Sequence, residues 1–250
     1  MQSQRTIVSA YFDLGREKWK HFARPLNEYV ENFKKNMTID ENMVLFIEPN
    51  MVDFVTEHRK GLEHKTKIII TNLDYLPKYQ IRKRIAAIQE SPEFKNGLAF
   101  PSAPELWHPD YVIISWSKID LVSRAIEDNY FDSTYFAWMD FGMPDFGQVK
   151  SFPKVFHEKI RVLCRRKPQP TDLNRVAMCK SHTNRFASGF ITGSVNYWRS
   201  FITLAENEMD LCLDLGVVDC DQTMYSNVYL QYPALFELYY GDWTDIIHKY

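Results

Sequence analysis

Short apolar runs alternate with amphipathic segments along the first half of this chain, and this alternation limits the folds that it can adopt. Thr6–Tyr11, Met43–Ile47 and Lys67–Thr71 have the length and composition of buried strands. Helical patterns at 27–36 and 51–59 separate these strands. Strands joined through helices are connected by right-handed crossovers, so the sequence predicts an α/β fold with a mostly parallel central sheet flanked by helices.

The second half of the chain continues the pattern with longer helices. We expect helices at 78–89, 112–129, 195–215 and 219–231, and strands at 135–139, 160–163 and 188–194. The basic stretch Arg165–Asp172 is broken by prolines and is expected to be a loop, and the aromatic tail from Phe236 is expected to be irregular. We expect one continuous domain rather than two.

The charge balance and the apolar segments exclude several classes of partner. The chain carries 30 Lys and Arg residues against 32 Asp and Glu residues, so no overall cationic field attracts nucleic acid. The start of the chain lacks the apolar core of a signal peptide, and no stretch approaches the ~18 apolar residues of a membrane span. The cysteines have no metal-ligand spacing. We therefore expect a cytoplasmic protein with no transmembrane segment and no nucleic-acid partner.

Acidic residues at the ends of predicted elements are the main candidates for chemistry, because no P-loop, GxGxxG, GxSxG or HExxH motif is present. Asp140 follows the predicted strand 135–139 and precedes Gly142. Ligands of open parallel sheets bind beyond the carboxyl ends of the strands. A divalent cation that bridges a diphosphate would use such a carboxylate, and an ordinary turn Asp before a Gly is the alternative.

A second acidic group, Asp219 to Gln222, precedes a predicted helix. Asp219 and Gln222 have the spacing of a capping box, so we expect Asp219 to cap the helix rather than to catalyse. Asp221 falls in the first turn, where the helix dipole stabilises a carboxylate. Together Asp221 and the Gln222 amide could bind sugar hydroxyls, and Asp221 could act as a general base. A purely stabilising role is the alternative.

Residues after the first predicted strand are suited to a nucleotide. Tyr11 could stack on a base, Asp13 could accept a hydrogen bond from a base or ribose, and Arg16 could pair with phosphate. Three further basic residues are candidates for phosphate binding, with a solvated or paired surface charge as the alternative: Lys118, Arg59 and Arg185.

Two glycines and one histidine complete the candidates. Gly189 and Gly193 bracket an apolar triplet, which indicates close approach of the backbone to a ligand or simple crowding between packed elements. His248 lies in the aromatic tail and could give a nitrogen ligand to a metal ion held by Asp140, with a frayed terminus as the alternative.

Six motifs in order resemble the HtrL/YibB-like family over nearly the whole chain. They are Ile7–Gly15, Ser117–Ile126, Trp138–Gly142, Ser188–Gly193, Asp221–Tyr225 and Tyr239–Trp243. That family is associated with lipopolysaccharide and surface-glycan loci and looks like a group of small GT-A-type glycosyltransferases. The resemblance implies a single GT-A-like domain over 1–250, with a nucleotide-sugar-binding half at 1–142 and an acceptor-binding half at 143–250.

The resemblance also implies a function, namely transfer of a sugar from a nucleoside-diphosphate-sugar donor to a hydroxyl of a glycan acceptor, with Mn²⁺ or Mg²⁺ as cofactor. Asp221 and Gln222 are the expected catalytic residues. The expected donor-binding residues are Tyr11, Asp13, Arg16, Lys118, Asp140, Gly189 and Gly193, and the expected metal ligands are Asp140 and His248.

The metal motif of this chain departs from the GT-A pattern. GT-A enzymes usually hold the cation with Asp-x-Asp, whereas Asp140-Phe141-Gly142 lacks the second Asp, and Asp145 is the nearest residue that could replace it. This departure motivates the alternative of a non-catalytic nucleotide- or carbohydrate-binding module on the same scaffold. A metal-dependent phosphohydrolase that uses Asp13 and Asp140 is a third hypothesis.

Overall fold

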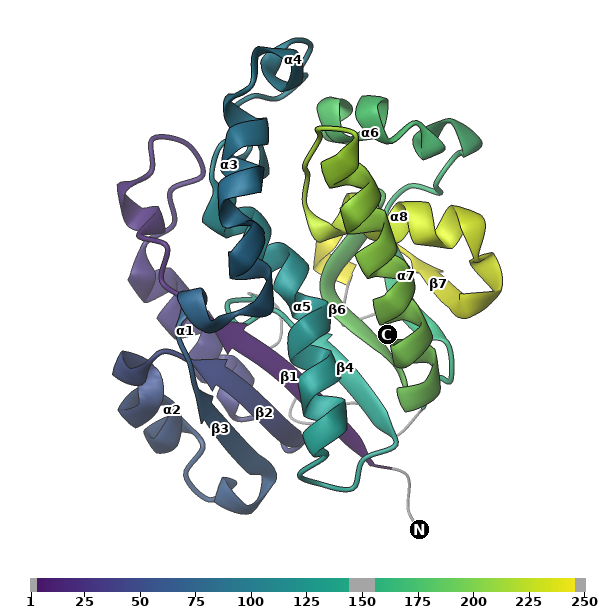
Figure 1. Ribbon diagram of the computed structural model, residues 1–250. Helices are drawn as coiled ribbons and strands as arrows, with labels where there is room; N and C mark the ends of the chain where they lie inside the picture. Colours follow the sequence, from purple (N-terminus) through teal and green to yellow (C-terminus); the bar gives the residue numbers. More distant parts are fainter. Residues whose placement is uncertain (1–3, 144–155, 246–250) are drawn as a thin grey trace.

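One seven-stranded sheet lies at the centre of the computed structural model, which describes residues 4–143 and 156–245 (Figure 1). The strands are β1 Arg5–Tyr11, β2 Asn42–Ile47, β3 Thr66–Ile70, β4 Tyr135–Met139, β5 Ile160–Cys164, β6 Phe186–Ser194 and β7 Phe236–Tyr240, in the order β3-β2-β1-β4-β6-β5-β7. Strand β6 is antiparallel to both of its neighbours, and the other pairings are parallel. The predicted α/β class and mostly parallel sheet are therefore confirmed.

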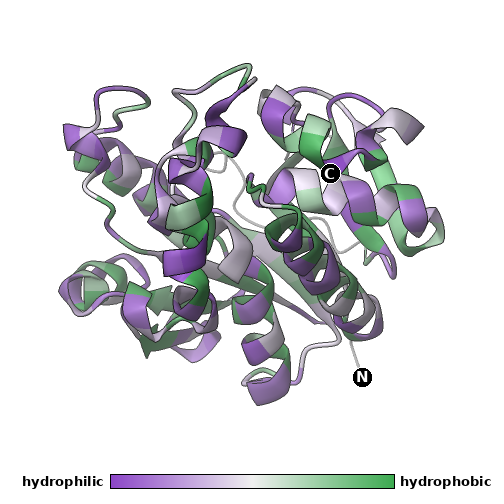
Figure 2. Ribbon diagram, turned by 45° about the horizontal axis from the view of Figure 1, so that its top comes forward, coloured by the Kyte–Doolittle hydropathy of each residue, from purple (hydrophilic) through white to green (hydrophobic). Residues whose placement is uncertain are grey.

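Helices cover both faces of this sheet. They are α1 Leu26–Met37, α2 Val52–His58, α3 Arg82–Glu90, α4 Pro92–Lys95, α5 Pro109–Asp128, α6 Arg175–Ser181, α7 Val195–Asp214 and α8 Asp221–Gln231. Helices α1 and α2 pack on one face, and α3, α5, α7 and α8 pack on the other (Figure 1). Figure 2 shows hydrophilic residues on the loops and outer helix surfaces and hydrophobic residues toward the sheet. None of the helices described is long and apolar enough to cross a membrane.

Alternation along the strands explains this two-sided core. In β2, Val44 and Phe46 face the cluster under α5 and α7, while Met43, Leu45 and Ile47 face the cluster under α1 and α2. A strand buried on both faces is apolar along its whole length, and this is why it is recognisable as a continuous apolar run.

The structure differs from the sequence prediction in several segments. The tail from Phe236 forms strand β7 beside β5 instead of irregular chain. The helix expected from residue 78 begins as a 3₁₀ turn, Pro77–Ile81, and becomes α-helical only at Arg82. Helices α4 and α6 were not expected, because each is too short for a clear apolar period.

Candidate functional site

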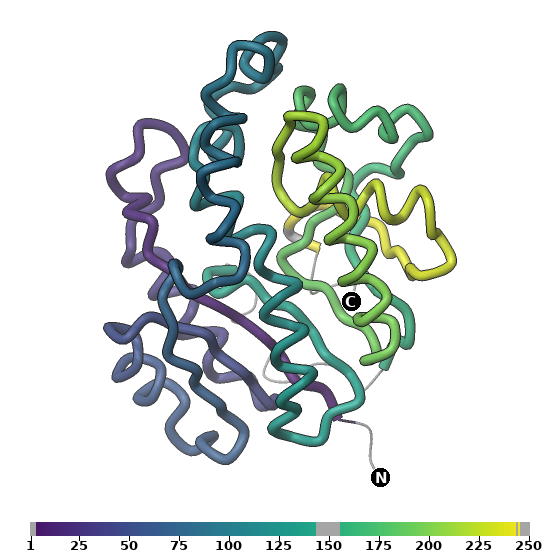
Figure 3. The backbone as a smooth tube through the Cα atoms, viewed as in Figure 1, coloured from purple at the N-terminus to yellow at the C-terminus, as the bar shows by residue number. Residues whose placement is uncertain are grey.

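A cleft of about 430 Å³ lies beyond the carboxyl ends of β1 and β4. Figure 3 shows the segments that follow β1 and precede β6 rising beyond the same end of the sheet. The cleft is lined by the end of β1, the segment after β4, one side of α5, the start of β6 and the start of α8. Of the predicted site residues, it brings together Tyr11, Asp13, Arg16, Lys118, Asp140, Gly189, Asp221 and Gln222.

Lys118 joins the two acidic motifs of the sequence. Its Nζ atom lies 3.0 Å from Asp140 Oδ1 and 3.1 Å from Asp221 Oδ2. The Asp221 side chain is 2% exposed, whereas that of Asp140 is 43% exposed and reaches the cleft. Burial alone would lower the pKa of Lys118, but the charges of Asp140 and Asp221 raise it above its usual value. One ammonium group therefore pairs with both carboxylates at the same time.

Asp221 is fixed on its other side by Ser115 of α5. The Ser115 hydroxyl donates to Asp221 Oδ1 at 2.8 Å and accepts from the Asp221 backbone N–H at 2.9 Å. Ser115 thus satisfies an N–H group of the first turn of α8, a task that a side chain of the same helix usually performs. The expectation that Asp219 caps this helix is wrong, because the N-cap residue is Cys220, and the Cys220 side chain makes no capping hydrogen bond.

The direction of β6 places Gly189 beside the cleft and Gly193 away from it. The Asp140 backbone N–H donates to Gly189 O at 2.8 Å, and a Cβ at Gly189 would lie 2.9 Å from the Met143 side chain. Because β6 is antiparallel, Gly193 pairs with Phe136, about 13 Å farther from the cleft at ~3.3 Å per residue. Gly193 is not among the described residues that line the cleft, and a Cβ there would meet Ile160 instead.

Aromatic rings and one arginine form the wall that follows β1. Tyr11 packs on Phe141, with 4.9 Å between ring centroids. Burial, together with the Asp13 charge, raises the pKa of Tyr11, so its hydroxyl stays protonated. Arg16 Nη1 donates to the Tyr29 hydroxyl. Asp13 is exposed, and its Oδ1 accepts from the Gly15 backbone N–H at 2.8 Å.

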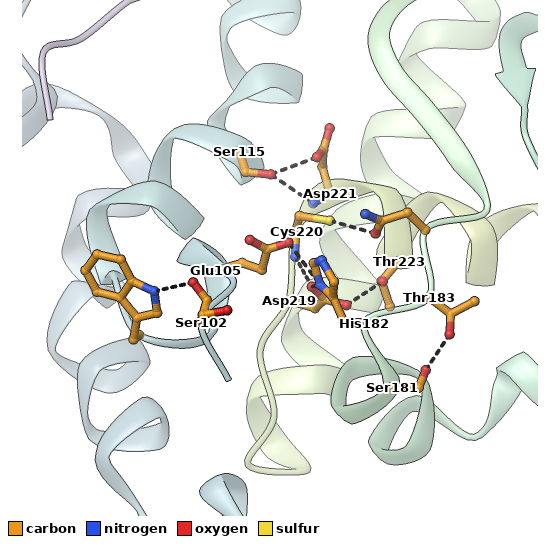
Figure 4. A network of polar contacts seen from close by, with 12 residues as sticks. Ser102, Glu105, Ser115, Ser181, His182, Thr183, Asp219, Cys220, Asp221 and Thr223 are labelled. Carbon is orange, nitrogen blue, oxygen red and sulfur yellow. Dashed lines mark hydrogen bonds and ion pairs between the residues drawn. The ribbon is translucent and has the colours of Figure 1, made fainter. Parts of the chain in front are cut away.

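A buried acidic group lies in the neighbouring wall (Figure 4). Glu105 Oε1 is 3.2 Å and Asp219 Oδ1 is 3.9 Å from His182 Nδ1. Burial and the Asp219 charge raise the pKa of Glu105 to about 7, and Asp219 and Glu105 raise the pKa of His182. The ligand atoms of Glu105, Asp219 and Cys220 all lie within 4.8 Å of one another and could hold a metal ion.

Neither of two further phosphate candidates lines the cleft. Arg59 is 1% exposed and donates to the carbonyl oxygens of Met37, Ile39 and Glu41, so it holds the connection between α1 and β2 together. The Arg185 guanidinium donates two hydrogen bonds to the Asp172 carboxylate in a bidentate ion pair, at 2.7 and 2.8 Å. His248 and Asp145 lie outside the described residues.

Sequence reasoning found Asp219 but missed its buried partners Glu105 and His182, together with part of the aromatic wall. Glu105 and His182 lie 77 positions apart in the chain, in short elements that the apolar pattern does not reveal. One local signal existed: Pro104-Glu105-Leu106 is a carboxylate between two apolar residues, and such a residue is seldom buried without a partner. Trp243 lines the cleft because β7, which was not expected, places it there.

Comparisons with known proteins give a family, a relative and likenesses to solved structures. The model of a family described as "Bacterial protein of unknown function (HtrL_YibB)" matches residues 3–250. Protein HtrL of Escherichia coli (strain K12) is 29% identical over 270 residues, which cover 98% of this chain and 92% of HtrL. A crystal structure of mouse xyloside xylosyltransferase 1, apo form, aligns with a TM-score of 0.45 and 10% identity, over 95% of this chain and 84% of that chain.

Proposed function

This chain belongs to the HtrL_YibB family of bacterial proteins of unknown function, and we propose from its cleft that it is a glycosyltransferase. It would move a sugar from a nucleoside-diphosphate-sugar donor to a hydroxyl group of a glycan acceptor. The observation that carries the proposal is Lys118, which fixes Asp140 and Asp221 side by side at the carboxyl end of the sheet. The family resemblance, which implies a donor half at 1–142 and an acceptor half at 143–250, supports the same proposal.

We place the nucleotide on the wall that follows β1. Tyr11, which is 7% exposed, lines this part of the cleft, and the exposed Asp13 carboxylate can accept from a base or a ribose hydroxyl. The Arg16 guanidinium lies within 5.7 Å of the ring centroids of Trp19, Tyr29 and Tyr111 and can pair with a diphosphate oxygen. These residues all line the cleft or contact residues that do.

We assign the reacting end of the cleft to Asp221 and Gln222. The Lys118 ammonium group lies 3.1 Å from Asp221 Oδ2, and we propose that this carboxylate accepts the proton of the acceptor hydroxyl. The deprotonated oxygen of the acceptor then bonds to the anomeric carbon of the donor sugar. The bond from this carbon to the donor diphosphate breaks, and the diphosphate leaves with the electron pair. The Gln222 Oε1 atom is buried and accepts no hydrogen bond from the described residues, so a sugar hydroxyl could donate to it.

One of the two carboxylate oxygens of Asp140 is suited to hold a cation. Its Oδ1 accepts from Trp138 Nε1 at 2.7 Å and faces Lys118, and its Oδ2 lies toward Gly189. We propose that Oδ2 binds Mn²⁺ or Mg²⁺, which would neutralise charge on the leaving diphosphate. His248 and Asp145 remain proposed further ligands.

A thermal-shift screen of nucleoside diphosphates and their sugars, with and without Mn²⁺, tests the proposal. A ligand at about 100 times its Kd adds ~2.7 kcal/mol to the free energy of unfolding. We expect stabilisation by one nucleotide that depends on Mn²⁺, and Asp140→Asn should abolish the metal-dependent part. Asp53→Asn, at an exposed position of α2, is the matched control.

Three other outcomes each revise the proposal in a defined way. Stabilisation without metal keeps the transferase and removes the cation from it. Binding with neither sugar transfer nor donor hydrolysis identifies a non-catalytic binding module. The absence of any nucleotide-dependent shift rejects the donor assignment.

A further inference from the structure

A second hollow, of about 600 Å³, lies beside the cleft. We call it the Trp19 hollow, and its lining residues are Lys18, Trp19, Lys20, His21, Pro101, Ser102 and Trp107. The rings of Trp19 and Trp107 meet edge to face with 5.1 Å between centroids. Trp107 is 39% exposed, and its Nε1 donates to Ser102 O at 2.9 Å, which fixes the orientation of the ring. Two large rings are therefore held in place on an open surface.

Charge at this hollow is one-sided. The segment from Arg16 to Arg24 contains four Lys and Arg residues and His21 against the single acidic residue Glu17, in a chain whose formal net charge is −2. No acidic residue is among the described residues that line the Trp19 hollow. Lys18 lies 3.9 Å from Glu17, but its side chain is 83% exposed, so water screens this pair and leaves the ammonium group available.

The Trp19 hollow adjoins the cleft. Trp19 contacts Tyr111 with 6.1 Å between ring centroids, and the Arg16 guanidinium lies 5.3 Å from the Trp19 ring. Both Tyr111 and Arg16 line the cleft. A chain of sugars that enters the cleft from this side would therefore cross the two tryptophan rings.

We propose that the Trp19 hollow binds the acceptor glycan through a sugar that carries a phosphate or carboxylate group. Aromatic rings offer flat apolar surface to the C–H face of a sugar ring, and the ammonium groups of Lys18 and Lys20 pair with the anion. A neutral sugar would gain nothing from these exposed ammonium groups. This inference deepens the proposed function and rests on it, since the bound sugar belongs to the acceptor of the same reaction. It places part of acceptor binding on residues 18–107, within the half 1–142 that the family resemblance assigns to the donor.

Saturation-transfer NMR with four probes tests the proposal: glucose, glucuronic acid, glucose 6-phosphate and inorganic phosphate. We expect the two charged sugars to bind at least tenfold more tightly than glucose and more tightly than phosphate. Trp107→Ala should abolish sugar binding. Lys18→Glu/Lys20→Glu should remove the preference for charged sugars and leave weak glucose binding. Lys35→Glu/Lys60→Glu changes the charge equally at exposed positions elsewhere and should have no effect.

Three results would overturn the proposal: equal binding of glucose and its charged derivatives, equal binding of phosphate alone, or unchanged binding in the Lys18→Glu/Lys20→Glu variant. Nucleotide binding, measured in the same variants, separates this failure from failure of the proposed function. If wild-type protein binds no nucleotide, the donor assignment fails whatever the sugars do. If Lys18→Glu/Lys20→Glu loses nucleotide binding instead of sugar binding, the hollow belongs to the donor and the acceptor assignment is wrong.

Discussion

The Ser115 hydroxyl and Asp221 exchange two hydrogen bonds between helices α5 and α8, one with the carboxylate and one with the backbone N–H. Ser115→Ala leaves both groups buried without this partner, so we expect a loss of about 1–3 kcal/mol in the free energy of unfolding. Urea unfolding measures it. Ser123→Ala removes an exposed hydroxyl of the same helix and should stay within ~0.5 kcal/mol of wild type. Equal effects of the two variants would contradict a special role of Ser115.

Lys118→Met should destabilise the protein strongly, because it leaves Asp221 buried with an unpaired charge. Removal of one partner of a buried ion pair costs about 3–5 kcal/mol. The exposure of Asp140 reduces its own share of this loss. Lys118→Met/Asp221→Asn removes both buried charges and should recover part of the stability, which chemical denaturation can measure. Lys83→Met, at an exposed position of α3, is the control. No recovery in the double variant would show that packing, not charge, is the main contribution of Lys118.

Glu105 should make stability fall as pH rises. Its pKa is raised from 4.5 to about 7, so between these values the folded state binds more protons than the unfolded state. The penalty is absent below pH 4.5 and complete above pH 7, where 2.5 units correspond to about 3 kcal/mol. Without metal, in EDTA, Glu105→Gln should match wild type at pH 4.5 and be more stable at pH 8. Urea unfolding at both pH values checks this, with Glu90→Gln on α3 as control.

Alanine variants of Gly189 and Gly193 distinguish an effect on the cleft from an effect on the packing of β6. A Cβ at Gly189 would lie 2.9 Å from the Met143 side chain and 3.3 Å from Asp140 Oδ2, whereas one at Gly193 would lie 3.0 Å from Ile160 Cδ1. We expect both alanine variants to lose about 1–3 kcal/mol through overpacking. Only Gly189→Ala should also weaken nucleotide binding in the thermal-shift assay. Weaker binding in Gly193→Ala would contradict the placement of that residue away from the site.

Much of the fold was predictable because its signals are local. Strands β2 and β4 are buried on both faces and are almost entirely apolar. Helix α7 ends at Asp214, and Gly216, two residues later, has the positive φ that is typical after a helix C-terminus. The direction of β6 was not predictable, since strand composition is the same for parallel and antiparallel pairing. That direction alone separates Gly189, which lines the cleft, from Gly193.

The candidate site was predictable where its residues follow strands. Asp140 lies at the end of β4, so the rule that ligands bind at carboxyl ends was sufficient to find it. The sequence gives no indication of the partners of Lys118, because 22 and 103 positions separate it from Asp140 and Asp221. Glu105 and His182 were missed for the same reason: tertiary packing, not local pattern, brings them together.

Strand β7 connects the edge of the sheet to the wall of the cleft. Among the described strands, β7 is at the edge of the sheet and pairs with β5 alone, and Trp243 of the cleft wall follows it. Edge strands separate from a sheet at a lower free energy than central ones, which have neighbours on both sides. We therefore expect the backbone amides of β7 to exchange with deuterium faster than those of β1 and β4. Transient release of this edge would widen the cleft at Trp243 while Lys118 and its two carboxylates stay in place.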